Sequence, residues 1–503
     1  MKDVTTEFSS TRPKSSFLGD VVKLVSGNAF AQILSILASP ILTRLYAPEA
    51  FGDLALFTSI TSIIGVIVCL RYELAIMLPE KDEEAANLIA LSIGIAAVIS
   101  LISIPIIWLA GSQIAGLLNA PNLSHYLWLI PPTLFFGGIG VGHPALNFWA
   151  TRTRRFKELS VTRVISSIIT TSIKLGAGFV GLATSGSMIG ANVIGSIVSP
   201  LILAGQIWRE EGKRILHSIR WRGVIYNIKR YRDFPLYSTW SALLNTTSVQ
   251  LPSLLLATFF SSTVVGYYAL GYRILQTPMG IIGNAIGQVF FQRASVAVKK
   301  GNLASVVENT FLHLLILGIY PFALLAGAGS EIFTILFGKS WANAGLYAQL
   351  LAPWIFFVFI HSPISTLFII REKQKVGLAY NIVLLVSRIV SLIIGGVLKQ
   401  PLAALGLFAL TGTISIVIID LWLLHNAGVN IVKLLVTTVP YICLSIINLA
   451  ILLGAKWIFN INNIWIIALS VLTTLLYYLY VLRRDKSIIN WVRDFITNLG
   501  TST

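Results

Sequence analysis

Fourteen long apolar stretches limit what this sequence can fold into. Each is about 20 residues or longer, and about 20 apolar residues in a helix cross the hydrocarbon core of a bilayer, roughly 30 Å thick. Hydrophobic residues make up 55% of the 503-residue chain and charged residues 11%, a balance that in water leaves too much apolar surface exposed. The predicted spans are 21–43, 50–70, 85–110, 124–149, 161–183, 187–208, 235–260, 264–292, 305–328, 344–370, 376–398, 402–425, 432–456 and 462–482.

The positions of the 37 Lys and Arg residues support this number of spans. If the connections alternate between the two sides of the membrane, 28 of these cations fall on one side, four on the other and five within spans. Cytoplasmic loops carry the excess of Lys and Arg, so both ends of the chain are predicted to be cytoplasmic. The net charge of +17 then fits contacts with anionic membrane lipids, and no nucleic-acid partner is expected.

The spans divide into two halves of nearly equal length and a final pair. Spans one to six cover 21–208, the predicted N-lobe, and spans seven to twelve cover 235–425, the predicted C-lobe. Each half has an even number of spans, so the halves are predicted to be parallel repeats. We expect an all-α integral membrane protein with two pseudo-symmetric six-helix lobes around a central cavity and a C-terminal helix pair. The other segments are the helix pair at 432–482 and three cytoplasmic segments: the N-terminal tail 1–20, the basic connection 209–233 and the amphipathic tail 483–503.

Matching positions in the two halves support a duplication. The polar positions 28, 32, 35 and 39 of span one have counterparts at 241, 245, 248 and 252 of span seven, a shift of 213 residues. A Gly-x-x-Ala-Leu pattern begins at Gly52 and again at Gly266, a shift of 214 residues. Between the halves, the basic connection carries an apolar stripe that predicts an amphipathic segment on the lipid headgroups. Direct contact with a substrate is the alternative for this connection.

The sequence offers little for catalysis. Its external connections are short, its six histidines are dispersed, and it has no His-Glu-x-x-His motif or clustered Asp motif. Cys69 and Cys443 are far apart and show neither metal-ligand nor redox spacing. We therefore expect no catalytic residue, no metal site and no cofactor, and the chain is predicted not to be an enzyme.

Cations within the spans indicate an anionic cargo. Lys174 and Arg388 lie deep in spans five and eleven, 214 residues apart, where an unpaired charge is costly. Acids that could neutralise them are scarce and lie toward span ends. Arg273 is a third such cation, although its side chain could instead extend to the interface between the membrane and water. A surplus of positive charge in a cavity between two halves suits an anion.

Further polar residues share helix faces with these cations. At 100° per residue, a continuous stripe on span eight runs from Arg273 to Gln288, and a face of span five joins Arg163 to Lys174. Each amide could instead form a hydrogen bond to a neighbouring helix. The candidate substrate-binding residues are Lys174, Arg273, Arg388, Arg163, Asn28, Gln32, Asn245, Gln276, Asn284, Gln288 and Arg44.

Three segments near the N-terminus resemble a known family. Residues 39–52 read SPILTRLYAPEAFG, residues 70–76 read LRYELAI, and the acidic connection at 79–84 reads PEKDEE. Together they resemble the start of Wzx-type polysaccharide flippases. These belong to the superfamily that also holds multidrug and toxin extrusion transporters and lipid II flippases. The motifs cover about the first 90 residues, and the predicted layout of spans fits nearly the whole chain.

The resemblance implies a function in the bacterial inner membrane. Flippases of this family move an undecaprenyl-diphosphate-linked oligosaccharide from the cytoplasmic to the periplasmic leaflet by alternating access, for O-antigen, capsule or exopolysaccharide synthesis. The implied partners are this substrate, membrane lipids, and the polymerase and chain-length regulator of the pathway. Arg44 could contact substrate at the outward mouth, and a lipid headgroup contact is the alternative. Efflux of drugs or small amphiphiles and a membrane-embedded polymerase or ligase remain alternative functions.

The resemblance also implies an ion gradient as the driving force, with H⁺ or Na⁺ as the coupling ion. A carboxylate in or beside a span is the usual site for such an ion. Glu73, Asp53 and Asp420 are the candidates. Each could instead be a structural partner or an interfacial charge.

Overall fold

The computed structural model describes residues 17–139, 145–457 and 463–484, and every regular element in these ranges is a helix. The predicted all-α membrane fold is therefore confirmed. The long helices are α1 (Phe17–Leu45), α2 (Pro48–Ile67), α4 (Asp82–Leu117), α8 (Phe156–Phe179), α9 (Ser185–Ser218), α11 (Thr239–Phe259), α12 (Ser262–Pro278), α13 (Asn284–Lys300), α14 (Leu303–Phe337), α15 (Ala342–Ile364), α17 (Gln374–Val397), α18 (Pro401–Asn426), α19 (Ile431–Trp457) and α20 (Asn463–Arg484).

Short helices connect the long ones, and two π-helical segments interrupt them. The short helices are α3 (Tyr72–Ala75), α5 (Leu123–Tyr126), η1 (Leu127–Leu129), α6 (Ile130–Ile139), α7 (Ala145–Arg152), α10 (Trp221–Arg230), η4 (Lys339–Trp341) and α16 (Leu367–Ile370). The π-helical segments are η2 (Phe234–Ser238) and η3 (Met279–Gly283).

Nine helical segments of the described ranges are long and apolar enough to cross a membrane. They contain α2, α4, α9, α14, α15, α17, α18, α19 and α20. The predicted number of fourteen spans stays a prediction. Helices α8 and α11 fall short because polar side chains interrupt them, and α12 ends after 17 residues at Pro278. Helix α1, which carries Asn28 and Gln32, is also outside these nine segments. These four helices carry most of the polar residues that the sequence marks as candidates for substrate binding.

The first of two compact units contains the described residues up to Tyr46 and Asp53–Leu254. Its core lies where α3, α4, α7, α9 and α10 meet, and Trp149 is fully buried there. The indole Nε1 of Trp149 donates a 2.9 Å hydrogen bond to Glu211, whose carboxylate also binds the buried guanidinium of Arg155. This contact holds the polar C-terminal part of α9 against α7.

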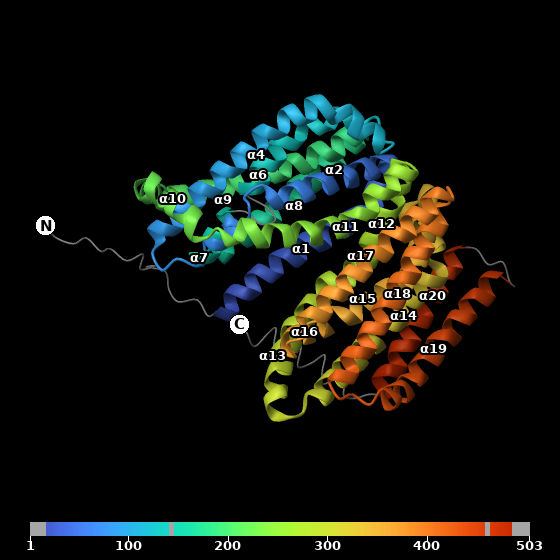
Figure 1. Cartoon of the computed structure of the whole chain (residues 1–503). Helices are drawn as coiled ribbons and strands as arrows, with labels where there is room; N and C mark the ends of the chain where they lie inside the picture. The colour runs from blue at the N-terminus through green and yellow to red at the C-terminus, as the bar shows by residue number, and fades with distance from the viewer. Residues whose placement is uncertain (1–16, 140–144, 458–462, 485–503) are drawn as a thin grey trace. The chain divides into compact units, whose positions relative to one another are not determined.

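The second unit contains Ala47–Gly52 and the described residues from Leu255 onward. Helices α14, α15 and α18 pack side by side in it, with α17 along α18 and α12 along α15 (Figure 1). The final pair, α19 and α20, packs on α14. Tyr477 and Tyr478 of α20 donate 2.8 Å hydrogen bonds to backbone carbonyls of α14, so polar groups join these helices within the apolar region.

The two glycines of the repeated Gly-x-x-Ala-Leu pattern meet in the second unit. A Cβ atom on Gly52 would lie 1.7 Å from the carbonyl oxygen of Ser262, and one on Gly266 would lie 2.0 Å from that of Pro48. The first turns of α2 and α12 can therefore approach backbone to backbone because neither position carries a side chain. The predicted lobe boundaries at 208 and 235 stay predictions.

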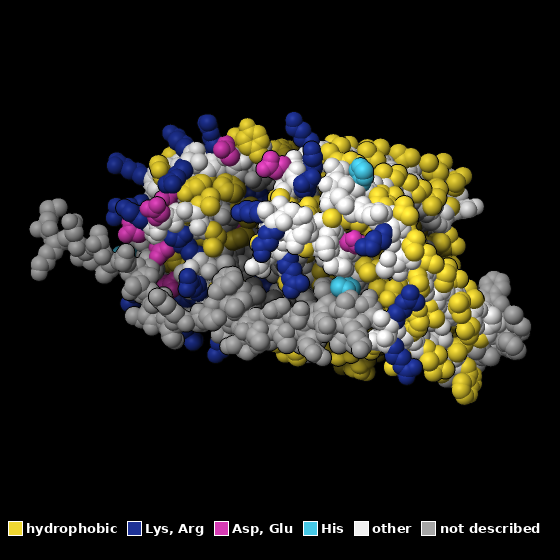
Figure 2. Space-filling view, turned by 90° about the horizontal axis from the view of Figure 1, so that it is seen from below, with side chains coloured by type: hydrophobic (Ala, Val, Ile, Leu, Met, Phe, Trp, Pro, Cys, Tyr) yellow, Lys and Arg dark blue, Asp and Glu magenta, His cyan; other side chains and the backbone are white. Residues whose placement is uncertain are grey.

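The surface shows an uneven distribution of charge. On the face in Figure 2, Lys and Arg side chains gather on one side, and hydrophobic side chains cover much of the other. Helix α10 adds exposed Trp221 and Tyr226 beside its basic residues. Asn87 of α4 accepts a 2.8 Å hydrogen bond from the backbone N–H of Arg220, so the predicted amphipathic connection is held on the first unit.

Candidate functional site

In the first unit, a cation of α8 meets a polar residue of α1. The guanidinium of Arg163 donates a 2.5 Å hydrogen bond to Oδ1 of Asn28. One turn later, the hydroxyl of Ser167 donates to the backbone oxygen of Ala31 at 3.2 Å. No carboxylate of the described residues pairs with Arg163. A neutral amide therefore orients this half-buried cation and leaves its charge uncompensated at the contact.

The second cation of α8 meets the next helix along the chain. Nζ of Lys174 donates a 2.7 Å hydrogen bond to Oδ1 of Asn192 on α9. Gly195 lets the two helices approach, since a Cβ atom there would lie 2.1 Å from the hydroxyl of Thr170. Lys174 lies five residues before the end of α8 at Phe179, and therefore about 7 Å from it along the axis. The sequence placed it nearer mid-span because the predicted span ended four residues later.

The other first-unit candidates are dispersed. Asn245 on α11 and Arg44 at the end of α1 are exposed, and Gln32 on α1 is half-buried. Asp53 is buried and accepts a 2.6 Å hydrogen bond from the hydroxyl of Ser185, the first residue of α9. The structure thus brings Asn28 together with Arg163 and does not place the remaining candidates in that contact.

In the second unit, Arg388 of α17 lies against aromatic rings. Its guanidinium carbon is 5.2 Å from the ring centroid of Trp354 on α15 and 5.6 Å from that of Phe408 on α18. The ring of Tyr272 stacks on Trp354 with centroids 6.1 Å apart. Aromatic faces stabilise a cation without neutralising it, so Arg388 keeps its positive charge in an apolar setting.

The predicted polar stripe of span eight is interrupted. Gln276 donates a hydrogen bond to the hydroxyl of Tyr272, one turn away on α12, and Arg273 is exposed. Beyond Pro278 the chain forms the π-helix η3, whose wider turns break the 100° periodicity assumed from the sequence. The prediction that one continuous polar face runs from Arg273 through η3 is therefore wrong. The side chains of Asn284 and Gln288 lie outside the described part of the structure.

Glu73 lies in the connection between α2 and α4, outside the spans. It is 3% exposed, and its Oε1 lies 3.6 Å from the guanidinium of Arg71. Leu70 and Arg71 both have positive φ, 47° and 63°, an unusual conformation for residues with a side chain. Burial raises the pKa of the Glu73 carboxyl to about 7, with Arg71 opposing the shift.

Asp420 forms a contact that the sequence did not predict. On α18 it is 3% exposed, and its Oδ1 lies 2.6 Å from Nδ1 of His361 on α15. One signal in the sequence could have indicated this contact, because His361 falls inside a predicted span. The dispersed spacing of the histidines hid it. No group of three or more His, Cys, Asp or Glu able to hold a metal ion occurs in the described residues.

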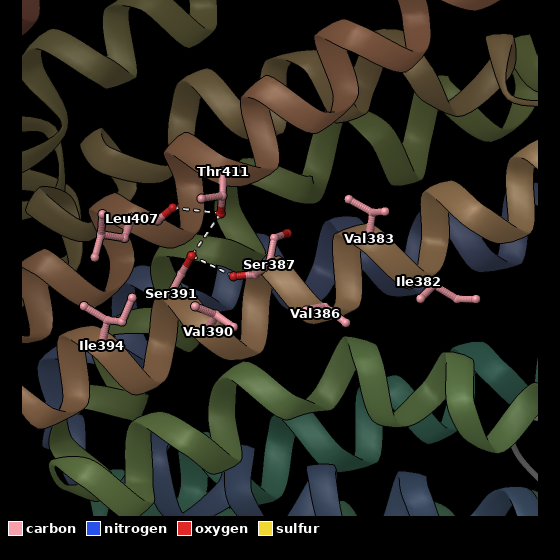
Figure 3. A pocket seen from close by; sticks show the side chains of 9 residues that line it. All are labelled: Ile382, Val383, Val386, Ser387, Val390, Ser391, Ile394, Leu407 and Thr411. Atoms are coloured by element: carbon pink, nitrogen blue, oxygen red, sulfur yellow. Dashed lines mark hydrogen bonds between the residues drawn. The ribbon is translucent and has the colours of Figure 1, made fainter.

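An apolar groove of about 470 Å³ lies along α17 and α18 (Figure 3). Its walls are aliphatic side chains such as Val386 and Ile394. The hydroxyl groups of Ser391 and Thr411 lie 3.1 Å apart and donate to the carbonyls one turn earlier in their own helices, as the dashed lines in Figure 3 show. These contacts satisfy the hydroxyl groups within the helices, so the groove presents an apolar surface.

Comparison with known proteins assigns the chain to a family. The profile of the polysaccharide biosynthesis protein family matches residues 41–345. The chain belongs to this family. Among solved structures, the lipid II flippase MurJ in an inward closed conformation is similar with a TM-score of 0.70 and 14% sequence identity, covering 92% of this chain and 98% of that chain. No protein with a curated function matches the sequence significantly.

A second solved structure extends the likeness. It is the inward-facing conformation of a multidrug resistance MATE family transporter of the MOP superfamily, with a TM-score of 0.56 and 14% identity. The match covers 81% of this chain and 98% of that chain. These structures confirm the all-helical fold, and the family match confirms the resemblance to a polysaccharide-synthesis family. The convergence of Lys174 and Arg163 with Arg273 and Arg388 on one cavity stays a prediction.

Proposed function

We propose that this chain is a flippase for a lipid-linked glycan. The proposed cargo is an undecaprenyl-diphosphate-linked oligosaccharide that moves from the cytoplasmic to the periplasmic leaflet of the inner membrane. The family match over residues 41–345 carries this proposal, because it ties a transporter fold to polysaccharide synthesis. O-antigen, capsule and exopolysaccharide pathways all use such a cargo.

The cations within the helices suit a diphosphate. A phosphate that enters hydrocarbon loses its hydration, and a cation held nearby replaces part of that loss. Asn28 fixes Arg163, and Asn192 fixes Lys174, through neutral amide oxygens. Both partners are neutral amides, so these two contacts do not neutralise the cations, and we expect the diphosphate to bind beside them.

The strength of each contact also matters. A cargo that crosses the membrane must leave its site, so the cations should hold it weakly enough to exchange. The aromatic neighbours of Arg388 meet this need, since rings and phosphate can share one guanidinium.

Efflux of small amphiphiles is the second candidate, and the fold shared with a multidrug MATE transporter favours it. The family match to polysaccharide biosynthesis and the cationic helices argue against it, because many such drugs are cations. A polymerase or ligase would need catalytic groups that neither the sequence motifs nor the described contacts supply.

A deletion strain tests the proposal. The flippase function predicts loss of surface glycan, with the lipid-linked repeat unit trapped in the cytoplasmic leaflet, where a membrane-impermeant glycosidase cannot reach it in intact cells. Trapping of single units in the outer leaflet would indicate the polymerase instead. Normal surface glycan combined with drug sensitivity would indicate efflux.

A further inference from the structure

The pair formed by His361 and Asp420 lies between three helices of the second unit. Asp420 belongs to α18, its partner His361 to α15, and the ring of Tyr380 on α17 lies 5.4 Å from the imidazole, centroid to centroid. The histidine side chain is 14% exposed and the aspartate side chain 5%. Six residues separate Asp420 from the end of α18 at Asn426, so the carboxylate lies inside the helix that spans the membrane.

One oxygen of this carboxylate lacks a partner among the described residues. Oδ1 takes the 2.6 Å contact with the imidazole, whereas the buried Oδ2 has no hydrogen-bond partner in the part of the chain that the structure describes. A buried, unsatisfied carboxylate oxygen is costly in hydrocarbon. Protonation of the pair lowers this cost, because it takes away the net charge.

We infer that His361 and Asp420 together hold one exchangeable proton and that this pair couples transport to a proton gradient. The inference rests on the proposed function, since coupling requires a transported cargo. A neutral imidazole beside a carboxylate has a net charge of −1. One added proton gives a neutral pair, either imidazolium with carboxylate or imidazole with carboxylic acid. Because the two groups share one short hydrogen bond, we assign the added proton to the pair and not to either residue alone.

The position of the pair links proton binding to conformation. His361 and Asp420 belong to different helices, so any movement of α15 against α18 changes the distance between Nδ1 and Oδ1. The affinity for the proton then differs between the inward-open and outward-open forms. A ligand drives a conformational cycle only through such a difference in affinity.

Charged and titratable groups lie on the helices packed around the pair. The two acids of α14 are engaged with α19: Glu308 lies 3.2 Å from Lys433, and Glu331 lies 2.7 Å from Lys456. Arg388 lies eight residues beyond Tyr380 on α17, about 12 Å along the axis. The other titratable or charged groups of the helices packed on α15 and α18 are Tyr267, Tyr268, Tyr272, Arg273, Arg293, Lys299, Lys300, His313, Tyr320, Lys339, Tyr347, Lys375, His425, Tyr441 and Cys443.

Infrared difference spectroscopy of the purified protein tests for the proton. As the pH falls, we expect a carboxylic acid or imidazolium signal in the wild type that Asp420→Asn lacks. Asparagine keeps the shape and one acceptor for the imidazole, so this variant should fold. His361→Gln should move the midpoint of the signal. Glu308→Gln is the matched control and should keep the signal. The same signal in Asp420→Asn as in the wild type would overturn the inference.

Export assays in the deletion strain test the coupling. In the deletion strain, the Asp420→Asn variant should give about tenfold less surface glycan than the wild type at normal protein level. The Glu308→Gln variant should give as much surface glycan as the wild type. Wild-type export in vesicles should follow the pH gradient. Dependence on a sodium gradient instead, or full export by Asp420→Asn, would refute proton coupling through this pair and leave the flippase function intact. Normal surface glycan in the deletion strain itself would refute the flippase function.

Discussion

Gly52→Ala should destabilise the contact between the first turns of α2 and α12. The added Cβ atom would lie 1.7 Å from the carbonyl oxygen of Ser262, whereas ordinary contacts of this kind begin near 3.4 Å. The two turns must therefore separate by about 1.5 Å, and backbone atoms cannot rotate out of the way as a side chain can. Overpacking of this kind costs about 1–3 kcal/mol. Gly266→Ala should behave alike, because its Cβ atom would lie 2.0 Å from the carbonyl oxygen of Pro48.

Thermal unfolding of the detergent-purified variants measures this effect. The chain has 12 tryptophans, among them Trp341, whose ring lies 4.8 Å from that of Phe51 beside the contact, so intrinsic fluorescence follows the unfolding of the whole protein. Gly65→Ala is the matched control in the same helix, because a Cβ atom there meets nothing within 4 Å. Alanine should leave that site unchanged or stabilise it by up to about 1 kcal/mol through helix propensity. Equal Tm values for Gly52→Ala and Gly65→Ala would refute the close approach.

Variants at three cations of the candidate site, and one variant in the connection after α2, have defined outcomes. Alanine at Lys174, Arg388 or Arg163 should lower glycan export about tenfold or more at normal protein level, because each removes a charge-assisted contact to the diphosphate. Lys174→Arg and Arg388→Lys should keep part of the export, and Lys157→Ala, exposed at the start of α8, should keep all of it. Normal export by the alanine variants would show these cations to be structural. Burial raises the pKa of Glu73 from 4.5 to about 7, so its contribution to stability is complete below pH 4.5 and is lost as the pH rises to 7. Above pH 7, Glu73→Gln should therefore raise Tm relative to the wild type, and the gain in the free energy of unfolding should be at most about 3 kcal/mol. A difference in Tm between variant and wild type that does not depend on pH would contradict this.

The sequence was sufficient for the fold class because hydrophobic length is a local property. Stretches of about 20 apolar residues and the asymmetry of Lys and Arg do not depend on which helices become neighbours. The same local reasoning failed at Pro278, where the missing N–H and the following π-helix change the rotation of the polar face. Helix periodicity predicts a face only while the helix remains regular.

Partners across the fold were beyond the reach of the sequence. Periodicity placed Asn28 and Arg163 on polar faces of separate helices, and nothing in either helix indicates that the two side chains meet 135 residues apart. His361 and Asp420 are 59 residues apart, and each looks isolated in the sequence. A contact of this kind depends on the register between packed helices, which side-chain volumes along the whole interface determine.

The polar character of α8 has a consequence for how the chain enters the membrane during synthesis. A helix with Arg163 and Lys174 along it partitions poorly into lipid as a separate segment. Its successor α9 is apolar enough to enter and begins six residues after α8 ends. Ser166 also donates a 3.0 Å hydrogen bond to the backbone oxygen of Gly195 on α9. We therefore expect α8 and α9 to enter the membrane together as one helical hairpin, with α8 inserting only after α9 has been synthesised.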